Sequence, residues 1–218
     1  WGREFSKMGH EVRLIPPQYV KPFVKRQKSD ATDAEAIAEA ACRPTMRFVS
    51  IKSAEQQALG AVFRSRDLIV RQRTQCINAL RAHLAEFGIV STRGIGSIKS
   101  LIHEAQSSDV NLPSDMQDVI AIYAKQIDGL CAQIATLEKK IKTQTQQDSF
   151  TRRLQSMPGV GPMTAAAIQA FAPPLDHFKT GRDFAAWLGL VPKQHSSGGI
   201  SRLGRTSKMG QRDIRRLL

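Results

Sequence analysis

The chain has 218 residues, and its 32 Lys and Arg residues outnumber its 19 Asp and Glu residues, giving a formal net charge of +13. Hydrophobic residues make up 41% of the chain, which is enough for a folded core, and no apolar run reaches the roughly 18 residues that a membrane helix needs. The three Cys residues are too few and too scattered for a secreted disulfide scaffold. Global disorder, a membrane span and a disulfide scaffold are therefore excluded as classes.

The positive charge is concentrated towards the two ends of the chain. The first thirty residues hold seven basic and three acidic residues, whereas residues 191–218 hold seven basic residues and Asp213 alone as an acid. Basic side chains placed against phosphates release condensed counterions, so such clusters favour a polyanionic partner. We predict DNA or another nucleic acid as the partner, and no membrane.

Residues 1–50 read as one edge of an α/β domain. A helix over residues 1–8 ends at Gly9, a short strand alternates over residues 10–15, and a basic loop over 21–28 leads into a helix from about 29 to 42. This order of helix, strand, loop and helix is typical of the edge of an α/β sheet domain.

Residues 51–150 are almost wholly helical in pattern. A first apolar stripe precedes a Gly- and Ser-containing connection at residues 88–114, and a second stripe with spacings of 3 and 4 follows it. The first stripe comprises Leu59, Val62, Ile69, Cys76, Leu80, Leu84 and Phe87. The second stripe is an a/d heptad seam, which predicts an antiparallel coiled-coil arm or half of a dimer interface. Its residues are Ile120, Tyr123, Ile127, Leu130, Ile134, Leu137 and Ile141. The three cysteines, Cys42, Cys76 and Cys131, lie in such helical patterns and are predicted to be buried and reduced.

Residues 151–218 begin with a helix, a Pro-Gly-Val-Gly turn and a second helix that opens at Pro162. Backbone amides at Gly159 and Gly161, with the helix N-terminus behind them, form a cradle for one phosphate, as in helix-hairpin-helix DNA binders. A plain turn between helices is the alternative. A further helix is predicted over residues 180–188.

Two aspartates, Asp30 and Asp33, stand three residues apart at the start of a predicted helix. Both carboxylates then lie on one helix face, where they are suitable ligands for Mg²⁺. The alternative is helix capping by Asp30, with the second acid also favouring the helix dipole.

Residues 195–202 form a polar, glycine-rich string in which a serine is accessible beside basic residues that stabilise charge on an attacked phosphate. A flexible Ser-Gly loop is the alternative interpretation. The basic run at residues 208–216 predicts a helix whose Arg212, Arg215 and Arg216 grip phosphate.

Four ordered motifs together carry a family resemblance. They are GHEVRLIPP at residues 9–17, KSDATDAEAI at 28–37, MPGVGP at 157–162, and GLVPKQHSSGG at 189–199 followed by RLGRTSKMG at 202–210. With the long heptad seam between them, the chain resembles the insertion sequence 110 family of transposases.

The resemblance implies a mostly α fold with a partial α/β part in three segments. Residues 1–50 correspond to the end of a ribonuclease-H-type (RuvC-like) domain with four acidic Mg²⁺ ligands, residues 51–150 to a long antiparallel coiled coil used for dimerisation, and residues 151–218 to a helical C-terminal transposase domain with a helix-hairpin-helix. Asp30 and Asp33 match the last two acids, and Ser197 matches the nucleophilic serine, or Ser196 if the register slips by one.

The activity implied is DNA recombination through a covalent phosphoserine, assisted by Mg²⁺ and guided by a structured RNA. Homo-oligomers, dimers or tetramers, would act on DNA in the bacterial cytoplasm. The family's first Asp and its Glu fall before Trp1, so we expect a fragment truncated at both ends and inactive alone. The expected DNA-binding residues are Gly159, Gly161, Lys193, Arg202, Arg205, Lys208 and Arg212.

Two other classes remain open at this point, and a third is disfavoured. A DNA-binding remnant without catalysis predicts binding with a steep salt dependence and no covalent adduct. A metal-dependent nuclease needs Asp30 and Asp33 but is indifferent to Ser197. A coiled-coil scaffold without nucleic acid leaves the basic ends unexplained.

Overall fold

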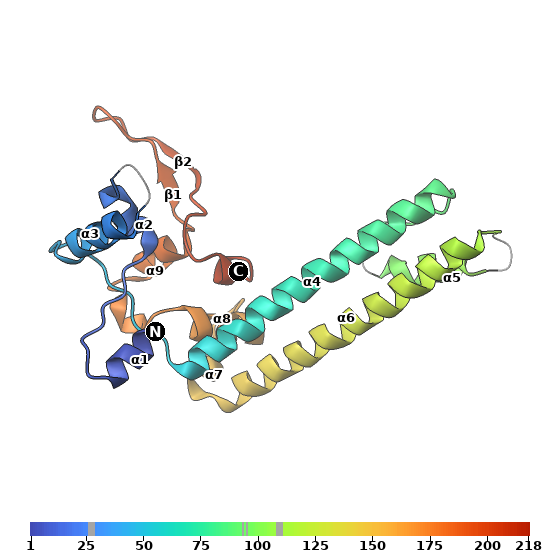
Figure 1. Cartoon of the computed structure of the whole chain (residues 1–218), viewed down its shortest axis with the longest axis horizontal. Helices are drawn as coiled ribbons and strands as arrows, with labels where there is room; N and C mark the ends of the chain where they lie inside the picture. Colours follow the sequence, from blue (N-terminus) through green and yellow to red (C-terminus); the bar gives the residue numbers. More distant parts are fainter. Residues whose placement is uncertain (26–28, 93, 95, 108–110) are drawn as a thin grey trace. The chain divides into compact units, whose positions relative to one another are not determined.

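A computed structural model describes residues 1–25, 29–92, 94, 96–107 and 111–218 (Figure 1). Most of the described residues lie in helices, and the sheet named among them has two strands, which confirms the predicted mostly α fold with a small β part. The chain forms two compact units, and each is built from two separate stretches of sequence. The first unit comprises Trp1–Gln57 and Phe171–Gly210, and the second comprises Ala58–Ala170 and Gln211–Leu218.

The N-terminal part of the first unit begins with α1 (Gly2–Lys7), α2 (Pro17–Val20) and the 3-10 turn η1 (Lys21–Phe23). Gly9 follows α1 with φ +86°, the left-handed conformation expected of a glycine that ends a helix. The helix expected from residue 29 is α3 (Asp30–Ala41).

The strand expected at residues 10–15 is wrong. Its place is taken by a single antiparallel bridge, in which the Val49 N–H donates to the Leu14 carbonyl at 2.7 Å. Pro16 and Pro17 follow directly and have no N–H to donate, so the ladder does not extend past this bridge. In the basic loop expected at residues 21–28, the part at 26–28 lies outside the described residues.

The C-terminal part of the first unit contains a 3-10 turn, η2 (Leu175–His177), the helix α9 (Gly181–Leu188) and two strands, β1 (Pro192–Gln194) and β2 (Leu203–Thr206). The helix predicted at residues 180–188 is confirmed. Thr180 caps α9, accepting from the Asp183 N–H at 3.2 Å while the Asp183 carboxylate accepts from the Thr180 N–H at 3.1 Å. The rings of Phe178, Phe184 and Trp187 pack on one another beside it.

The second unit is dominated by two long helices, α4 (Ala54–Glu86), whose first turn belongs to the first unit, and α6 (Ser114–Gln147). The Arg66 guanidinium donates to the Glu138 carboxylate at 2.9 Å, and Arg73 reaches the Cys131 sulfur at 3.7 Å. From the first contact to the second, the residue of α4 lies further along the chain while its partner in α6 lies further back. The two helices therefore run antiparallel (Figure 1).

The heptad stripe of α6 is its packed face within this one chain. Ile120 and Ile141 have no exposed surface, and Ile127, Leu130 and Ile134 are buried as well. Phe87 of the first stripe is 45% exposed, so that stripe ends one turn earlier than its spacing predicts. Supercoiling and dimerisation stay predictions.

A nine-residue helix, α5 (Ser97–Ala105), lies inside the stretch that the sequence analysis took as a connection. Its Ile98, Leu101 and Ala105 are buried in the core of the second unit, at the spacing of one helix face. The Arg81 guanidinium of α4 donates to the Ser97 hydroxyl at 2.8 Å and to the Gly94 carbonyl, which holds the segment before α5 against α4.

The cysteines are only partly as expected. Cys76 and Cys131 are half-buried and pack against the core of the second unit, but Cys42 is exposed at the C-terminus of α3, so its predicted burial is wrong. The buried face of α3 is formed by Ala36 and Ala40, and Cys42, at the C-cap, does not lie on that face. In the described part of the chain, no helix combines the length and the apolarity required for crossing a bilayer.

Candidate functional site

Asp30 and Asp33 lie in the first turn of α3, Asp30 exposed and Asp33 half-buried. Neither caps the helix. The Ser29 hydroxyl accepts from the Thr32 N–H at 3.2 Å, and the Thr32 hydroxyl accepts from the Ser29 N–H at 3.3 Å. Capping by Asp30 is therefore wrong, because Ser29 already occupies the cap position. The two carboxylates still gain from the positive end of the helix dipole.

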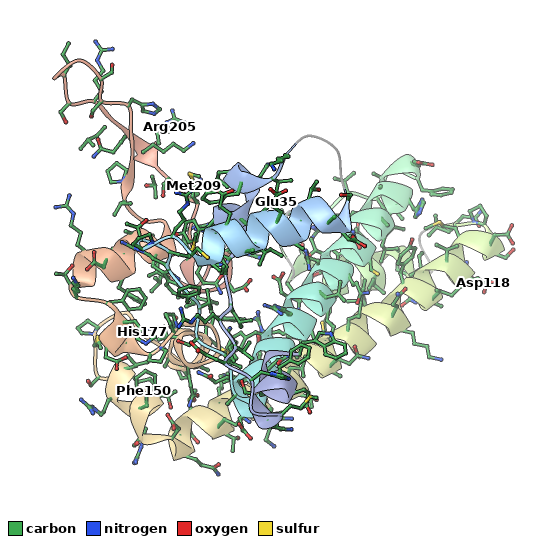
Figure 2. All side chains as sticks on the ribbon, turned by 60° about the vertical axis from the view of Figure 1, so that its left-hand side comes forward. Glu35, Asp118, Phe150, His177, Arg205 and Met209 are labelled. Carbon is green, nitrogen blue, oxygen red and sulfur yellow. The ribbon has the colours of Figure 1, made fainter. Side chains whose placement is uncertain are left out.

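The aspartate pair fits a hard cation such as Mg²⁺ in its chemistry. Mg²⁺ is usually held by one or two carboxylates together with substrate phosphates and water. Glu35, the next acid of α3 (Figure 2), is 2.6 Å from the Lys25 ammonium and raises the pKa of Lys25, so it is engaged as a salt-bridge partner. Over the described ranges, no cluster of three or more His, Cys, Asp and Glu side chains is present.

Residues 195–202, expected as a loop, extend β1 and β2 into one β-hairpin over residues 192–206. The His195 N–H donates to the Arg202 carbonyl at 2.9 Å, and Ser197 and Ile200 exchange backbone hydrogen bonds of 3.3 and 3.0 Å. The two residues between them, Gly198 and Gly199, have φ values of +56° and +78°. Two consecutive positive φ values are the mark of a type I′ hairpin turn, which glycine adopts at little cost.

Ser196 and Ser197 differ in what their hydroxyls do. The Ser196 hydroxyl donates to the Gln194 amide oxygen at 2.9 Å and accepts from the Arg202 N–H at 3.1 Å. Ser197 is exposed beside the turn, and strand alternation places its side chain on the other face of the hairpin. These contacts favour Ser197 as the reactive serine and give Ser196 a structural role.

The hairpin and the segment after it carry four exposed basic residues, Lys193, Arg202, Arg205 and Lys208. Figure 2 shows Arg205 on the hairpin, and no acidic residue occurs between Pro192 and Arg212 in the sequence. Lys208 has φ +54°, an unfavourable value for a residue with a side chain, and its N–H donates to the Gly189 carbonyl at 3.0 Å.

The predicted helix, turn and helix at the Pro-Gly-Val-Gly motif are confirmed as local structure. Helix α7 (Ser149–Leu154) ends before the turn, Gly159 has φ +83°, and α8 (Pro162–Phe171) opens on its proline. The Gly161 carbonyl accepts the first helical bond, from the Ala165 N–H at 2.9 Å. Phosphate binding at Gly159 and Gly161 stays a prediction.

The basic C-terminal helix is shorter than expected. The structure has α10 (Arg212–Arg215), with Gln211 extended at its N-cap and Lys208 in the left-handed conformation before it. Arg212 is exposed, whereas the Arg216 guanidinium donates to the Asp67 carboxylate of α4 at 2.8 Å. Arg216 is exposed but is paired with Asp67 within the second unit, and phosphate binding by Arg212, Arg215 and Arg216 stays a prediction.

The candidate residues fall in both units. The first unit holds Asp30, Asp33, Lys193, Ser197, Arg202, Arg205 and Lys208, and the second holds Gly159, Gly161 and Arg212. Within the first unit, the tip of the hairpin stands clear of α3 in both views (Figures 1 and 2).

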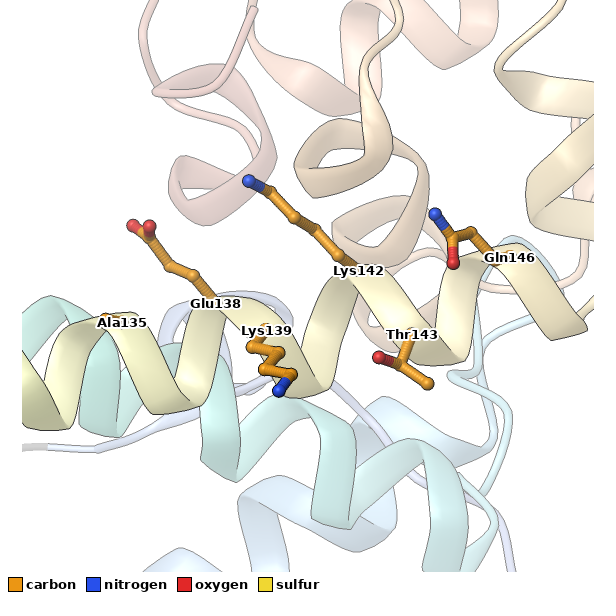
Figure 3. A pocket seen from close by; sticks show the side chains of 6 residues that line it. All are labelled: Ala135, Glu138, Lys139, Lys142, Thr143 and Gln146. Carbon is orange, nitrogen blue, oxygen red and sulfur yellow. The ribbon is translucent and has the colours of Figure 1, made fainter.

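A shallow depression on α6 carries no chemistry of this kind. Six residues of that single helix line it: Ala135, Glu138, Lys139, Lys142, Thr143 and Gln146. Figure 3 shows them as two neighbouring rows on the helix surface. The Glu138 carboxylate is already bound to Arg66, so the depression is an ordinary helix surface.

Gly210, which follows the hairpin, makes a close contact that the sequence does not predict. Gly210 packs so closely on the end of α9 that a Cβ there would lie 2.1 Å from the Trp187 carbonyl oxygen and 2.2 Å from the Gly189 nitrogen. Only glycine fits without a backbone shift. Its place in the sequence, outside any turn pattern, gives no signal of this contact.

Comparisons with known proteins match both halves of this site. A family model described as "Transposase" matches residues 5–89, which include Asp30 and Asp33, and the model "Transposase IS116/IS110/IS902 family" matches residues 151–218, which include Ser197. The chain belongs to the IS116/IS110/IS902 family of transposases. The family resemblance read from the four motifs is thereby confirmed.

Relatives that carry transposase names align with nearly the whole chain. The "Probable family 20 transposase" of Pseudomonas aeruginosa is 46% identical over all of this chain and 65% of its own length. The transposase for insertion sequence element IS1328 of Yersinia enterocolitica is 41% identical over 99% of this chain and 64% of its own. That for element IS1111A of Coxiella burnetii is 38% identical over all of this chain and 60% of its own. The chain thus spans less than two thirds of the length of these relatives.

Proposed function

We propose that this chain cleaves and joins DNA strands as part of a transposase in which Ser197 is the nucleophile. The observation that carries the proposal is the exposed Ser197 beside a type I′ turn, on a hairpin whose exposed charges are all basic. Family membership supports DNA as the substrate.

The step that follows from a serine nucleophile conserves phosphodiester bonds. A bond forms between the Ser197 oxygen and the phosphorus as the bond from phosphorus to one deoxyribose oxygen breaks. The Ser197 proton passes to solvent, and the released deoxyribose oxygen takes a proton from solvent. The phosphoserine is then attacked by a hydroxyl of another DNA strand, which restores Ser197 and joins the strands without hydrolysis.

Asp30 and Asp33 would hold Mg²⁺ through their carboxylates. When bound, Mg²⁺ neutralises phosphate charge and so makes the phosphorus easier to attack. Since the hairpin tip stands clear of α3, we propose that the metal-holding pair and the serine act together only in an assembly of more than one chain on DNA. A structured guide RNA and a dimer or tetramer belong to this proposal through the family resemblance.

The test is a search for the covalent protein–DNA adduct. The purified chain is incubated with Mg²⁺, a labelled duplex bearing the ends of its own mobile element and RNA transcribed from that element, and products are separated under denaturing conditions. Ser197→Ala abolishes the adduct while DNA binding is retained, and Ser201→Ala, at an exposed serine of the same hairpin, serves as the matched serine control. Adduct that persists in Ser197→Ala would contradict the proposal.

The same assay separates the other candidate functions. Cleavage that needs Asp30 and Asp33 but survives Ser197→Ala identifies a metal-dependent nuclease. Binding with a steep salt dependence, with neither cleavage nor adduct, identifies a DNA-binding remnant.

A further inference from the structure

The hairpin has two chemically different faces. In an antiparallel pair, residues directly opposite each other point to the same side. The hydrogen bonds pair Ser197 with Ile200 and His195 with Arg202, so these four side chains share one face. The residues between them, including Ser196, point to the opposite face.

The direction of the diagonal contacts on the Ser197 face is visible at His195. The His195 ring leans towards Gly204, which lies two positions beyond Arg202, the residue directly opposite His195. A Cβ built on Gly204 would lie 2.7 Å from His195 Nε2. The same step from Ser197, two positions beyond its partner Ile200, leads to Arg202. Such diagonal neighbours are roughly 7–8 Å apart at their Cα atoms, which a long side chain spans.

Arg202 is fixed at this position from the other face. Its N–H donates to the Ser196 hydroxyl at 3.1 Å, and that hydroxyl donates to the Gln194 amide oxygen at 2.9 Å. These contacts tie Gln194 and Ser196 of one strand to Arg202 of the other, beside the backbone bond from His195 to Arg202. We call this set, formed by Gln194, Ser196 and the Arg202 backbone, the polar clasp.

We propose that Arg202 holds the phosphate that Ser197 attacks, and that the polar clasp positions Arg202 for this task. A guanidinium presents a planar fork of donors that suits two phosphate oxygens at once. This inference deepens the proposed function and rests on Ser197 as the nucleophile. In the step described above, Arg202 forms and breaks no covalent bond and stabilises the negative charge that builds on the phosphate oxygens.

The decisive experiment places a phosphate on Ser197 itself. Phosphoserine is incorporated at position 197 of the full chain by an expanded genetic code, and its second pKa, ordinarily about 6, is measured by ³¹P NMR titration in 0.15 M salt. With Arg202 present, the pKa is expected to lie about half a unit below that of the same protein carrying Arg202→Ala, because a nearby cation favours the dianion.

Arg205 provides the matched control on the same hairpin. Arg205 is also exposed, and Arg205→Ala removes the same charge as Arg202→Ala. Arg205 lies three strand positions from Arg202, a distance of about 10 Å, which is roughly one Debye length in this buffer. Arg205→Ala is expected to leave the phosphoserine pKa within about 0.2 units. Equal shifts for the two variants, or none for Arg202→Ala, overturn the proposal.

Ser196 variants test the positioning role. Ser196→Ala removes the clasp and is expected to raise the phosphoserine pKa by part of the increase seen in Arg202→Ala. Ser196→Thr keeps a hydroxyl and is expected to leave the phosphoserine pKa at the value measured with Ser196 present. An unchanged pKa in Ser196→Ala overturns the role of the clasp and leaves that of Arg202 intact.

The DNA assay then tells the two proposals apart. At saturating DNA, Arg202→Ala is expected to slow adduct formation by about 10²–10³-fold, while Lys139→Ala, which removes an exposed charge from α6, stays within a few-fold of the unmodified chain. Persistent adduct in Ser197→Ala would defeat the nucleophile assignment, and the phosphoserine titration would still report whether Arg202 reaches the phosphate position.

Discussion

The helix pair of the second unit and the hairpin of the first unit are built in opposite ways. Leu80 of α4 and Ile120 of α6 have no exposed surface, and both belong to one buried hydrophobic core. All residues from Pro192 to Leu203 are exposed, so burial gives no reason for the identities of those that form neither the turn nor the polar clasp. The comparison teaches that packing explains the apolar residues buried in the helix pair but does not explain the exposed basic residues of the hairpin.

The largest expected effect is a cavity in the helix pair. Leu80→Ala is expected to lower the free energy of unfolding by about 2–5 kcal/mol, because a fully buried side chain is truncated. Urea unfolding followed by circular dichroism measures it. Leu203→Ala on the hairpin, 63% exposed, is expected to change stability by less than about 0.5 kcal/mol. A comparable loss in both variants would break the contrast between the regions.

The next effect concerns the base of the hairpin. Gly210→Ala is expected to lower the free energy of unfolding by about 1–3 kcal/mol. The new Cβ would collide with backbone atoms of Trp187 and Gly189, which cannot move aside as a flexible side chain can. Unfolding followed by Trp fluorescence measures the loss. Gly181→Ala is the control, since nothing lies within 4 Å of a Cβ there, and it is expected to be neutral or slightly stabilising.

The parts of the fold that follow from local rules were predictable from sequence. The heptad spacing of α6, the glycine after α1 and the proline that opens α8 each depend on neighbouring residues only. The hairpin was missed although its Gly198-Gly199 pair is a known signal of a type I′ turn, because serine and glycine also suit flexible loops. Helix α5 was missed because it is only nine residues long, too short for its apolar spacing to repeat more than twice.

The candidate site was predictable in residue type but not in arrangement. That Ser29 caps α3, leaving Asp30 and Asp33 without that role, depends on the backbone conformation at one residue. The division of labour between Ser196 and Ser197 depends on strand register, and the pairing of Arg216 with Asp67 joins residues far apart in the chain. Such contacts follow from tertiary structure and leave no local pattern.

A smaller effect sharpens the assignment of the hairpin to a polyanion. Arg205→Ala is expected to reduce the slope of log binding constant against log salt concentration by about 1, because one phosphate contact is lost. Fluorescence anisotropy with labelled duplex DNA at several salt concentrations measures the slope. Lys139→Ala, which removes an exposed charge from α6, is expected to leave it unchanged. Equal losses would indicate binding through net charge alone.

The smallest effect separates stability from binding at one residue. Lys208 has φ +54°, which costs a residue with a Cβ about 1 kcal/mol. Lys208→Gly relieves this strain and is expected to raise the free energy of unfolding by about 0.5 kcal/mol, part of the gain being offset by the freedom of glycine in the unfolded chain. Lys208→Ala keeps the strain, so its stability stays near that of the unmodified chain. Both variants lose the same charge and are expected to lose the same salt slope in DNA binding. If the salt slope is unchanged in both variants, Lys208 lies outside the DNA interface. Its strained conformation is then explained by the hydrogen bond with Gly189 alone.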